Sequence, residues 1–173
     1  VDNPPANIDT IVEQFANKHL VAAGQLLQGD DLESFRKDFN TRLDGFRKAL
    51  SADRDEPFYR DCVVSQGERF SSLILAHVLR SKGYKSEALC SEDAGIVAEG
   101  HSMAGSANLL RTASGMTMQV KPLLATGVIP IITGFYGANQ DGKPVTFGRG
   151  GFMSADPRII PDAIKIDEMN FGE

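Results

Sequence analysis

Apolar side chains in residues 32–50 recur at spacings of three and four, which places them on one helical stripe. The stripe consists of Leu32, Phe35, Phe39, Leu43, Phe46 and Leu50. Asp30 and Glu33 form a cap of the D-x-x-E type before it, typically worth about 1 kcal/mol. Similar spacing in residues 8–27 ends at Gly29. The pattern therefore predicts a pair of helices at the start of the chain.

From Cys62 onward, short apolar runs alternate with stretches of helical spacing. We expect, in order, a strand at 62–65, a turn at Gly67 and Glu68, a helix closed by Gly83, strands at 84–89 and 94–98, a helix at 116–126, a fully buried strand at 128–133, and a hairpin whose tight turn is Asp141-Gly142. Strands alternating with helices favour an α/β fold, here a three-layer αβα sandwich with a mainly parallel sheet.

Chain length and charge narrow the function classes. The 173 residues suit one domain, with residues 1–60 as the helical pair and 61–173 as the sheet-forming part. Eighteen basic and twenty-three acidic side chains give a net charge of -5, so we expect no nucleic-acid or anionic-membrane partner. No apolar run approaches the roughly 20 residues of a membrane span, and we expect a cytoplasmic protein.

Two motifs resemble known sites but lack essential parts. Gly137 to Pro144 nearly matches a phosphate-binding loop, yet it lacks the final hydroxyl and precedes strand-forming residues. Gly100 to Gly105 resembles a hydrolase nucleophile elbow, but no histidine follows Ser102. His77 is predicted to be a packing residue in the middle of a helix, and no metal site is predicted. The isolated Cys62 and Cys90 are predicted to be buried thiols.

Glycines around one arginine form the strongest candidate site. Gly134 ends a predicted buried strand, while Gly148, Gly150 and Gly151 surround Arg149. Successive glycines can direct their N–H groups at an anion, and a guanidinium holds a carboxylate or phosphate by two parallel bonds. A glycine-rich surface turn with a solvated arginine explains the same spacing equally well.

Four segments, taken together, carry a more specific signal. SQGERFSSLILAHVLRSKGY, VIPIITGFYG, GKPVTFGRGG and ADPRIIPDAIKIDEMNF occur in this order. This set resembles the catalytic domain of aspartate kinases, in the amino acid kinase superfamily. The resemblance implies ATP-dependent phosphorylation of the β-carboxylate of L-aspartate to 4-phospho-L-aspartate, for lysine, methionine and threonine synthesis, with ATP and Mg²⁺ as cofactors. The family commonly forms homodimers, and the sequence leaves the oligomeric state open.

The resemblance also implies roles for individual residues. Glu68 would bind the ammonium group of the substrate. The alternative is that its carboxylate only stabilises the N-terminus of a helix, without any ligand. Phe135 would line the aspartate pocket, and Arg149 would hold a substrate carboxylate with Gly150 and Gly151. The nucleotide site would comprise Gly134, Asp156, Pro157 and Arg158.

The sequence departs from the family in three places. It contains no K-F-G-G-T-S turn, whose lysine serves phosphoryl transfer, and no helix and D-V-D-G-like loop between GRGG and ADPR. It also contains no F-G-A-K stretch and no ACT domain. No catalytic residue is therefore assigned. Two explanations stay open: segments of a longer protein are not included in the sequence, or the protein is a shortened, inactive binding or assembly module. A superfamily kinase for another carboxylate or phosphate acceptor is a further alternative.

Overall fold

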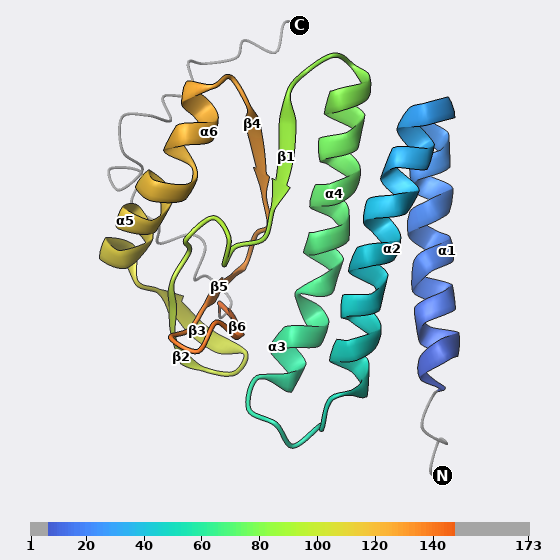
Figure 1. Ribbon diagram of the computed structural model, residues 1–173. Helices are drawn as coiled ribbons and strands as arrows, with labels where there is room; N and C mark the ends of the chain where they lie inside the picture. The colour runs from blue at the N-terminus through green and yellow to red at the C-terminus, as the bar shows by residue number, and fades with distance from the viewer. Residues whose placement is uncertain (1–6, 148–173) are drawn as a thin grey trace, which may run out of the picture.

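The computed structural model describes residues 7–147, and its first elements are the two predicted helices (Figure 1). Helix α1 (Ile8–Leu26) starts after Asn7, whose side chain accepts a hydrogen bond from the Asp9 N–H. Helix α2 (Gly29–Ser51) follows almost at once. The predicted cap at Asp30 is wrong because α2 already begins at Gly29. Asp30 lies in the first turn of α2, where its negative charge interacts favourably with the positive end of the helix dipole.

The segment predicted as a strand at 62–65 is helical, and no turn interrupts the chain at Gly67. Helix α3 (Tyr59–Val64) runs through the right-handed Ser65 into helix α4 (Gln66–Ser81). The valines suggested a buried strand, yet Val64 is 43% exposed, whereas Asp61 is fully buried. The packing of Asp61 therefore determines the conformation here, and it overrides the local strand preference.

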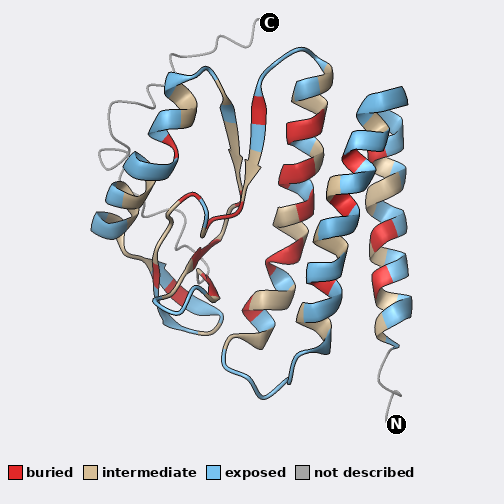
Figure 2. Ribbon diagram, in the orientation of Figure 1, coloured by how far each residue is buried: buried red, intermediate tan, exposed pale blue. Residues whose placement is uncertain are grey.

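Phenylalanine rings form the core between α1, α2 and α4. The apolar stripe predicted for α2 supplies three of these buried rings, and α4 supplies Phe70. Buried segments accordingly recur along α1, α2 and α4 (Figure 2). Phe70 meets Phe39 edge to face at 5.0 Å. Burying one such side chain contributes roughly 1.5–3 kcal/mol, so this core holds the helical pair against α4.

Two parallel strands lie between the helical layers. Strand β1 (Ser86–Leu89) pairs with β4 (Ile129–Ile132), with Ser86 opposite Ile129 and Leu89 opposite Ile132. Helix α4 packs against β1, and α5 and α6 lie on the opposite side (Figure 1). Both strands were predicted, but the expected full burial of 128–133 is wrong because Ile129 is 40% exposed.

The connection from β1 to β4 holds a hairpin and two helices. The strand predicted at 94–98 is displaced: β2 (Ala98–His101) pairs antiparallel with β3 (Ala104–Ala107), and residues 91–95 form turns. The helix predicted at 116–126 is two helices, α5 (Leu109–Gln119) and α6 (Lys121–Ala125). Pro122 lacks the N–H that a continuous helix would use, which explains the interruption at Val120.

The predicted hairpin at Asp141-Gly142 is confirmed. Strand β5 (Tyr136–Ala138) pairs antiparallel with β6 (Pro144–Thr146), and Gly142 has φ +73° in the turn. A strand therefore follows where a phosphate-binding loop would require a helix. The α/β fold class is confirmed, with one parallel and two antiparallel ladders within residues 7–147.

Asp61 connects the helices to these strands. Its Oδ1 accepts hydrogen bonds from the Thr146 N–H and Oγ1, both at 2.7 Å, and from the Met103 N–H at 3.0 Å. Its Oδ2 accepts one from Ser102 Oγ. One carboxylate thus joins α3 to the β2–β3 turn and to β6. Separately, none of the helices in the described part of the chain is both long and apolar enough to cross a membrane.

Candidate functional site

The candidate site lies where β1 and β4 end. Residues 90–92 follow β1 and residues 133–135 follow β4, and because the two strands are parallel, both segments leave the same edge. Helix α4 starts beside them, with Glu68 in its first turn. Carboxyl ends of parallel strands are the usual place for a ligand in an α/β sheet.

The structure brings Glu68, Gly134 and Phe135 together from distant parts of the chain. The Gly134 N–H donates to Glu68 Oε2 at 3.4 Å, a long bond across 66 residues of sequence. The Glu68 carboxylate is half-buried, and within residues 7–147 no Lys, Arg or His nitrogen lies within 4.0 Å of it. Among the described residues, the Gly134 amide is therefore the only hydrogen-bond donor to this carboxylate.

Phe135 occupies a tight turn between β4 and β5. Its φ is +52°, a left-handed conformation that non-glycine residues seldom adopt. Two backbone bonds frame it: the Tyr136 N–H donates to the Gly134 carbonyl at 2.9 Å, and the Phe147 N–H donates to the Phe135 carbonyl at 2.8 Å. The turn is thus tied to the end of β6, which leads directly to Gly148.

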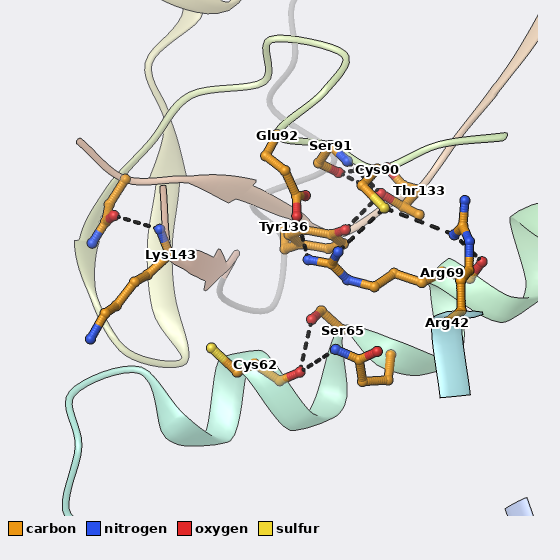
Figure 3. A network of polar contacts seen from close by, with 12 residues as sticks. Arg42, Cys62, Ser65, Arg69, Cys90, Ser91, Glu92, Thr133, Tyr136 and Lys143 are labelled. Atoms are coloured by element: carbon orange, nitrogen blue, oxygen red, sulfur yellow. Dashed lines mark hydrogen bonds and ion pairs between the residues drawn. The ribbon is translucent and has the colours of Figure 1, made fainter. Parts of the chain in front are cut away.

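Hydrogen bonds connect the buried hydroxyl groups of Ser91, Thr133 and Tyr136, and the last two residues flank this turn in the sequence (Figure 3). The Ser91 N–H donates to Thr133 Oγ1 at 2.7 Å, and Thr133 Oγ1 donates to the Tyr136 hydroxyl at 3.0 Å. Ser91 Oγ also donates to the Thr133 carbonyl at 2.9 Å. All three residues are at most 2% exposed. These hydrogen bonds therefore join the segment after β1 to the segment after β4.

An ion pair closes the other side of the same cluster. Arg69 Nη2 lies 2.5 Å from Glu92 Oε1, and the guanidinium carbon lies 5.4 Å from the centre of the Tyr136 ring (Figure 3). Burial raises the pKa of Tyr136 although Arg69 opposes this, so the phenol is neutral at physiological pH. Arg69 Nε and Glu92 Oε2 are buried with no hydrogen-bond partner among the described residues.

The predictions for the two thiols and for His77 are largely confirmed. Cys90 is buried and Cys62 is half-buried, and both are free. Burial raises the pKa of the Cys90 thiol despite the opposing charges of Arg69 and Arg42, which keeps it protonated. His77 is 2% exposed and packs edge to face on Phe35 with ring centres 5.5 Å apart.

A groove of about 720 Å³ lies between α2, α3, α4 and the β5–β6 hairpin. Arg42, Cys62, Arg69, Cys90 and Lys143 are among its lining residues. Glu68 and Phe135 do not line it, so the groove and the turn after β4 are separate features.

Several predicted site residues lie outside the described residues: Arg149, Gly150, Gly151, Asp156, Pro157 and Arg158. Conversely, no pattern in the sequence indicated the cluster around Tyr136. Arg69 stands beside Glu68 in the Gly-Glu motif, but its partner Glu92 is 23 residues away. No local sequence pattern indicates the pairing of Arg69 with Glu92.

Comparisons with known proteins identify the family of the chain. The profile of the family described as "Amino acid kinase family" matches residues 8–152. Aspartokinase of Geobacillus stearothermophilus is 30% identical over 138 residues, which cover 65% of this chain and 33% of that protein. Aspartokinase of Mycolicibacterium smegmatis is 28% identical over 143 residues, covering 68% and 33% respectively. The chain thus spans about a third of the length of these relatives.

Solved structures show the same fold. E. coli aspartokinase III in complex with lysine and aspartate aligns with a TM-score of 0.72 at 20% identity, covering 86% of this chain and 33% of that chain. The same protein in complex with aspartate and ADP aligns with a TM-score of 0.71. Together with the profile match over most of its length, these similarities establish that the chain belongs to the amino acid kinase family.

Proposed function

We propose that this chain forms part of an aspartate kinase, which transfers the γ-phosphoryl group of ATP to the β-carboxylate of L-aspartate. The product would be 4-phospho-L-aspartate, the activated acid that leads to lysine, methionine and threonine. The observation that carries the proposal is the Glu68 carboxylate, which meets the Gly134 amide and has no cationic partner among residues 7–147. The similarity to aspartokinases supports the choice of substrate.

Each predicted residue has a role in this scheme. Glu68 would bind the ammonium group of aspartate, and Phe135 would pack against the carbon chain. Arg149, with Gly150 and Gly151, would hold a carboxylate. In the sequence these three residues come two to four positions after Phe147, whose N–H donates to the Phe135 carbonyl.

ATP would bind through the Gly134 backbone and through Asp156, Pro157 and Arg158. Within residues 7–147, no three His, Cys, Asp or Glu side chains gather closely enough to hold a metal ion. Mg²⁺ would arrive with the phosphates of ATP, whose charge it neutralises. Bringing two anions together is the main requirement of this reaction, so cations and aimed N–H groups matter more than a strong base.

ATP-dependent hydroxamate formation by the intact gene product tests the proposal. Aspartate, glutamate and succinate would be offered separately as acceptors with hydroxylamine. We expect product with aspartate only. Product with another acceptor would assign the protein to a different kinase of the family. Calorimetric binding of aspartate or ATP without turnover would instead identify an inactive binding module.

A further inference from the structure

The turn that carries Gly134 and Phe135 is held from below by a hydroxyl that the proposed reaction does not use. Tyr136 is 1% exposed, and its hydroxyl accepts the hydrogen bond from Thr133 Oγ1 at 3.0 Å. Its backbone N–H meanwhile donates to the Gly134 carbonyl at 2.9 Å. Tyr136 therefore contacts the turn through its backbone and the residue before the turn through its hydroxyl.

These hydrogen bonds are needed to hold the turn because its backbone is strained. Phe135 has φ +52°, which a non-glycine residue keeps only where the surroundings enforce it. The surroundings here are the pairing of β5 with β6 on one side and the hydroxyl chain Ser91–Thr133–Tyr136 on the other. Thr133 immediately precedes Gly134, so these hydrogen bonds fix the residue just before the turn.

The Arg69 guanidinium holds the ring of Tyr136 from the opposite side. It lies 5.4 Å from the ring centre and is itself fixed by Glu92 at 2.5 Å. Arg69 directly follows Glu68 in α4. The same helical turn therefore supplies Glu68, which accepts from the Gly134 N–H, and Arg69, which contacts the Tyr136 ring. Tyr136 and the contact between Glu68 and Gly134 are therefore connected through one turn of α4.

We propose that Tyr136 is a positioning residue: its hydroxyl, linked through Thr133 to Ser91, sets the Gly134–Phe135 turn at the distance from Glu68 that aspartate binding requires. This inference rests on the proposed function for the identity of the ligand. The geometric part of it, that the hydroxyl sets the turn, stands on the hydrogen bonds alone.

Tyr136→Phe removes the hydroxyl and keeps the ring under Arg69. Tyr84→Phe, at a residue that is 57% exposed, is the matched control. Thr133→Val removes the hydroxyl that connects Ser91 to Tyr136, whereas Thr133→Ser keeps a hydroxyl at this position. At a temperature where all variants are folded, we expect Tyr136→Phe and Thr133→Val to raise the KM for aspartate about fivefold, with kcat changed less than about twofold.

Thr133→Ser and Tyr84→Phe should behave like the wild type. A purely structural role would lower the melting temperature but leave the KM for aspartate unchanged, and that result would overturn the proposal. Equal losses in Thr133→Ser and Thr133→Val would also overturn it, because the hydroxyl would then be irrelevant.

Amide hydrogen exchange separates this proposal from the proposed function. In Tyr136→Phe, the amides of Gly134 and Tyr136 should exchange about tenfold faster than in the wild type, while amides in α1 stay unchanged. If the wild type does not bind aspartate, the proposed function fails, and the exchange result alone decides whether the hydroxyl positions the turn. Unchanged exchange at both amides would refute it.

Discussion

Replacing Asp61 with asparagine should destabilise the protein by weakening the link between its helices and strands. The carboxylate is fully buried and accepts three hydrogen bonds on Oδ1, from the N–H and Oγ1 of Thr146 and from the Met103 N–H. Asparagine keeps one oxygen for these donors but loses the negative charge. Hydrogen bonds to a charged group contribute about 1.5–3 kcal/mol each, and neutral ones about 0.5–1.5 kcal/mol.

The net loss is smaller than the sum of three such differences. A neutral amide costs less to bury than a carboxylate, and bonds that share one acceptor are not additive. We therefore expect Asp61→Asn to lower the free energy of unfolding by about 2 kcal/mol, against a typical total of about 5–15 kcal/mol. Asp61→Ala leaves the donors of Thr146 and Met103 unpaired and should cost about 4 kcal/mol or more.

The same carboxylate makes stability depend on pH. Burial alone would raise the pKa of Asp61, but the hydrogen bonds from Ser102, Thr146 and Met103 outweigh burial and hold the pKa below its ordinary value of 3.8. The stabilisation by Asp61 is therefore complete above pH 3.8, and it is lost as the pH falls below that value through the lower pKa of the folded state.

Urea denaturation followed by circular dichroism measures the effect. The midpoint should fall in Asp61→Asn with an unchanged slope, and the difference from wild type should shrink as the pH is lowered below about 4. Asp55→Asn, at an exposed residue of the α2–α3 connection, is the matched control and should change little. A midpoint within error of the wild type at pH 7 would refute the assigned role of Asp61.

Four other substitutions probe the packing and the pH dependence of stability. Gly95→Ala should cost about 3 kcal/mol in thermal unfolding because its Cβ would meet the Gly115 backbone at 2.6 Å, whereas Gly127→Ala, also at positive φ but in open space, should cost about 1 kcal/mol. Equal costs would contradict the clash. Phe39→Ala should cost about 3–5 kcal/mol in urea denaturation, and less than 1 kcal/mol would contradict its place in the core. Burial and then Arg80 lower the pKa of His77 despite Asp38, so stability should fall as the pH drops below about 6.5, and His77→Gln should flatten this fall. An unchanged pH profile in that variant would contradict the assignment.

Periodicity in the sequence identified those elements whose packing follows from their own pattern. The stripe of phenylalanines in α2 and the apolar run of β4 both carry local signals. The segment at 62–65 misled because its valines favour a strand locally, while its fold is decided by Asp61, which bonds to Thr146 across 85 residues. Local propensity cannot represent such a distant partner.

The site shows the same division. The resemblance of the Gly-Glu motif and the T-G-F segment to aspartate kinases pointed to Glu68, Gly134 and Phe135, and the structure does bring them together. Nothing in the sequence indicated Ser91 or Tyr136. A serine and a tyrosine become a network only after β1 and β4 have paired, so their role follows from the fold rather than from any motif.

The role of Glu68 as the partner of the substrate ammonium group is tested by comparing L-aspartate with succinate, which lacks only the amino group. Isothermal titration of the intact gene product should show aspartate binding at least about 30-fold tighter, because Glu68 would pair with the ammonium group in a half-buried site. Glu68→Gln should abolish most of that preference, whereas Glu87→Gln, at an exposed position on β1, should preserve it. A preference for aspartate that survives in Glu68→Gln, or its absence from the wild type, would contradict the account.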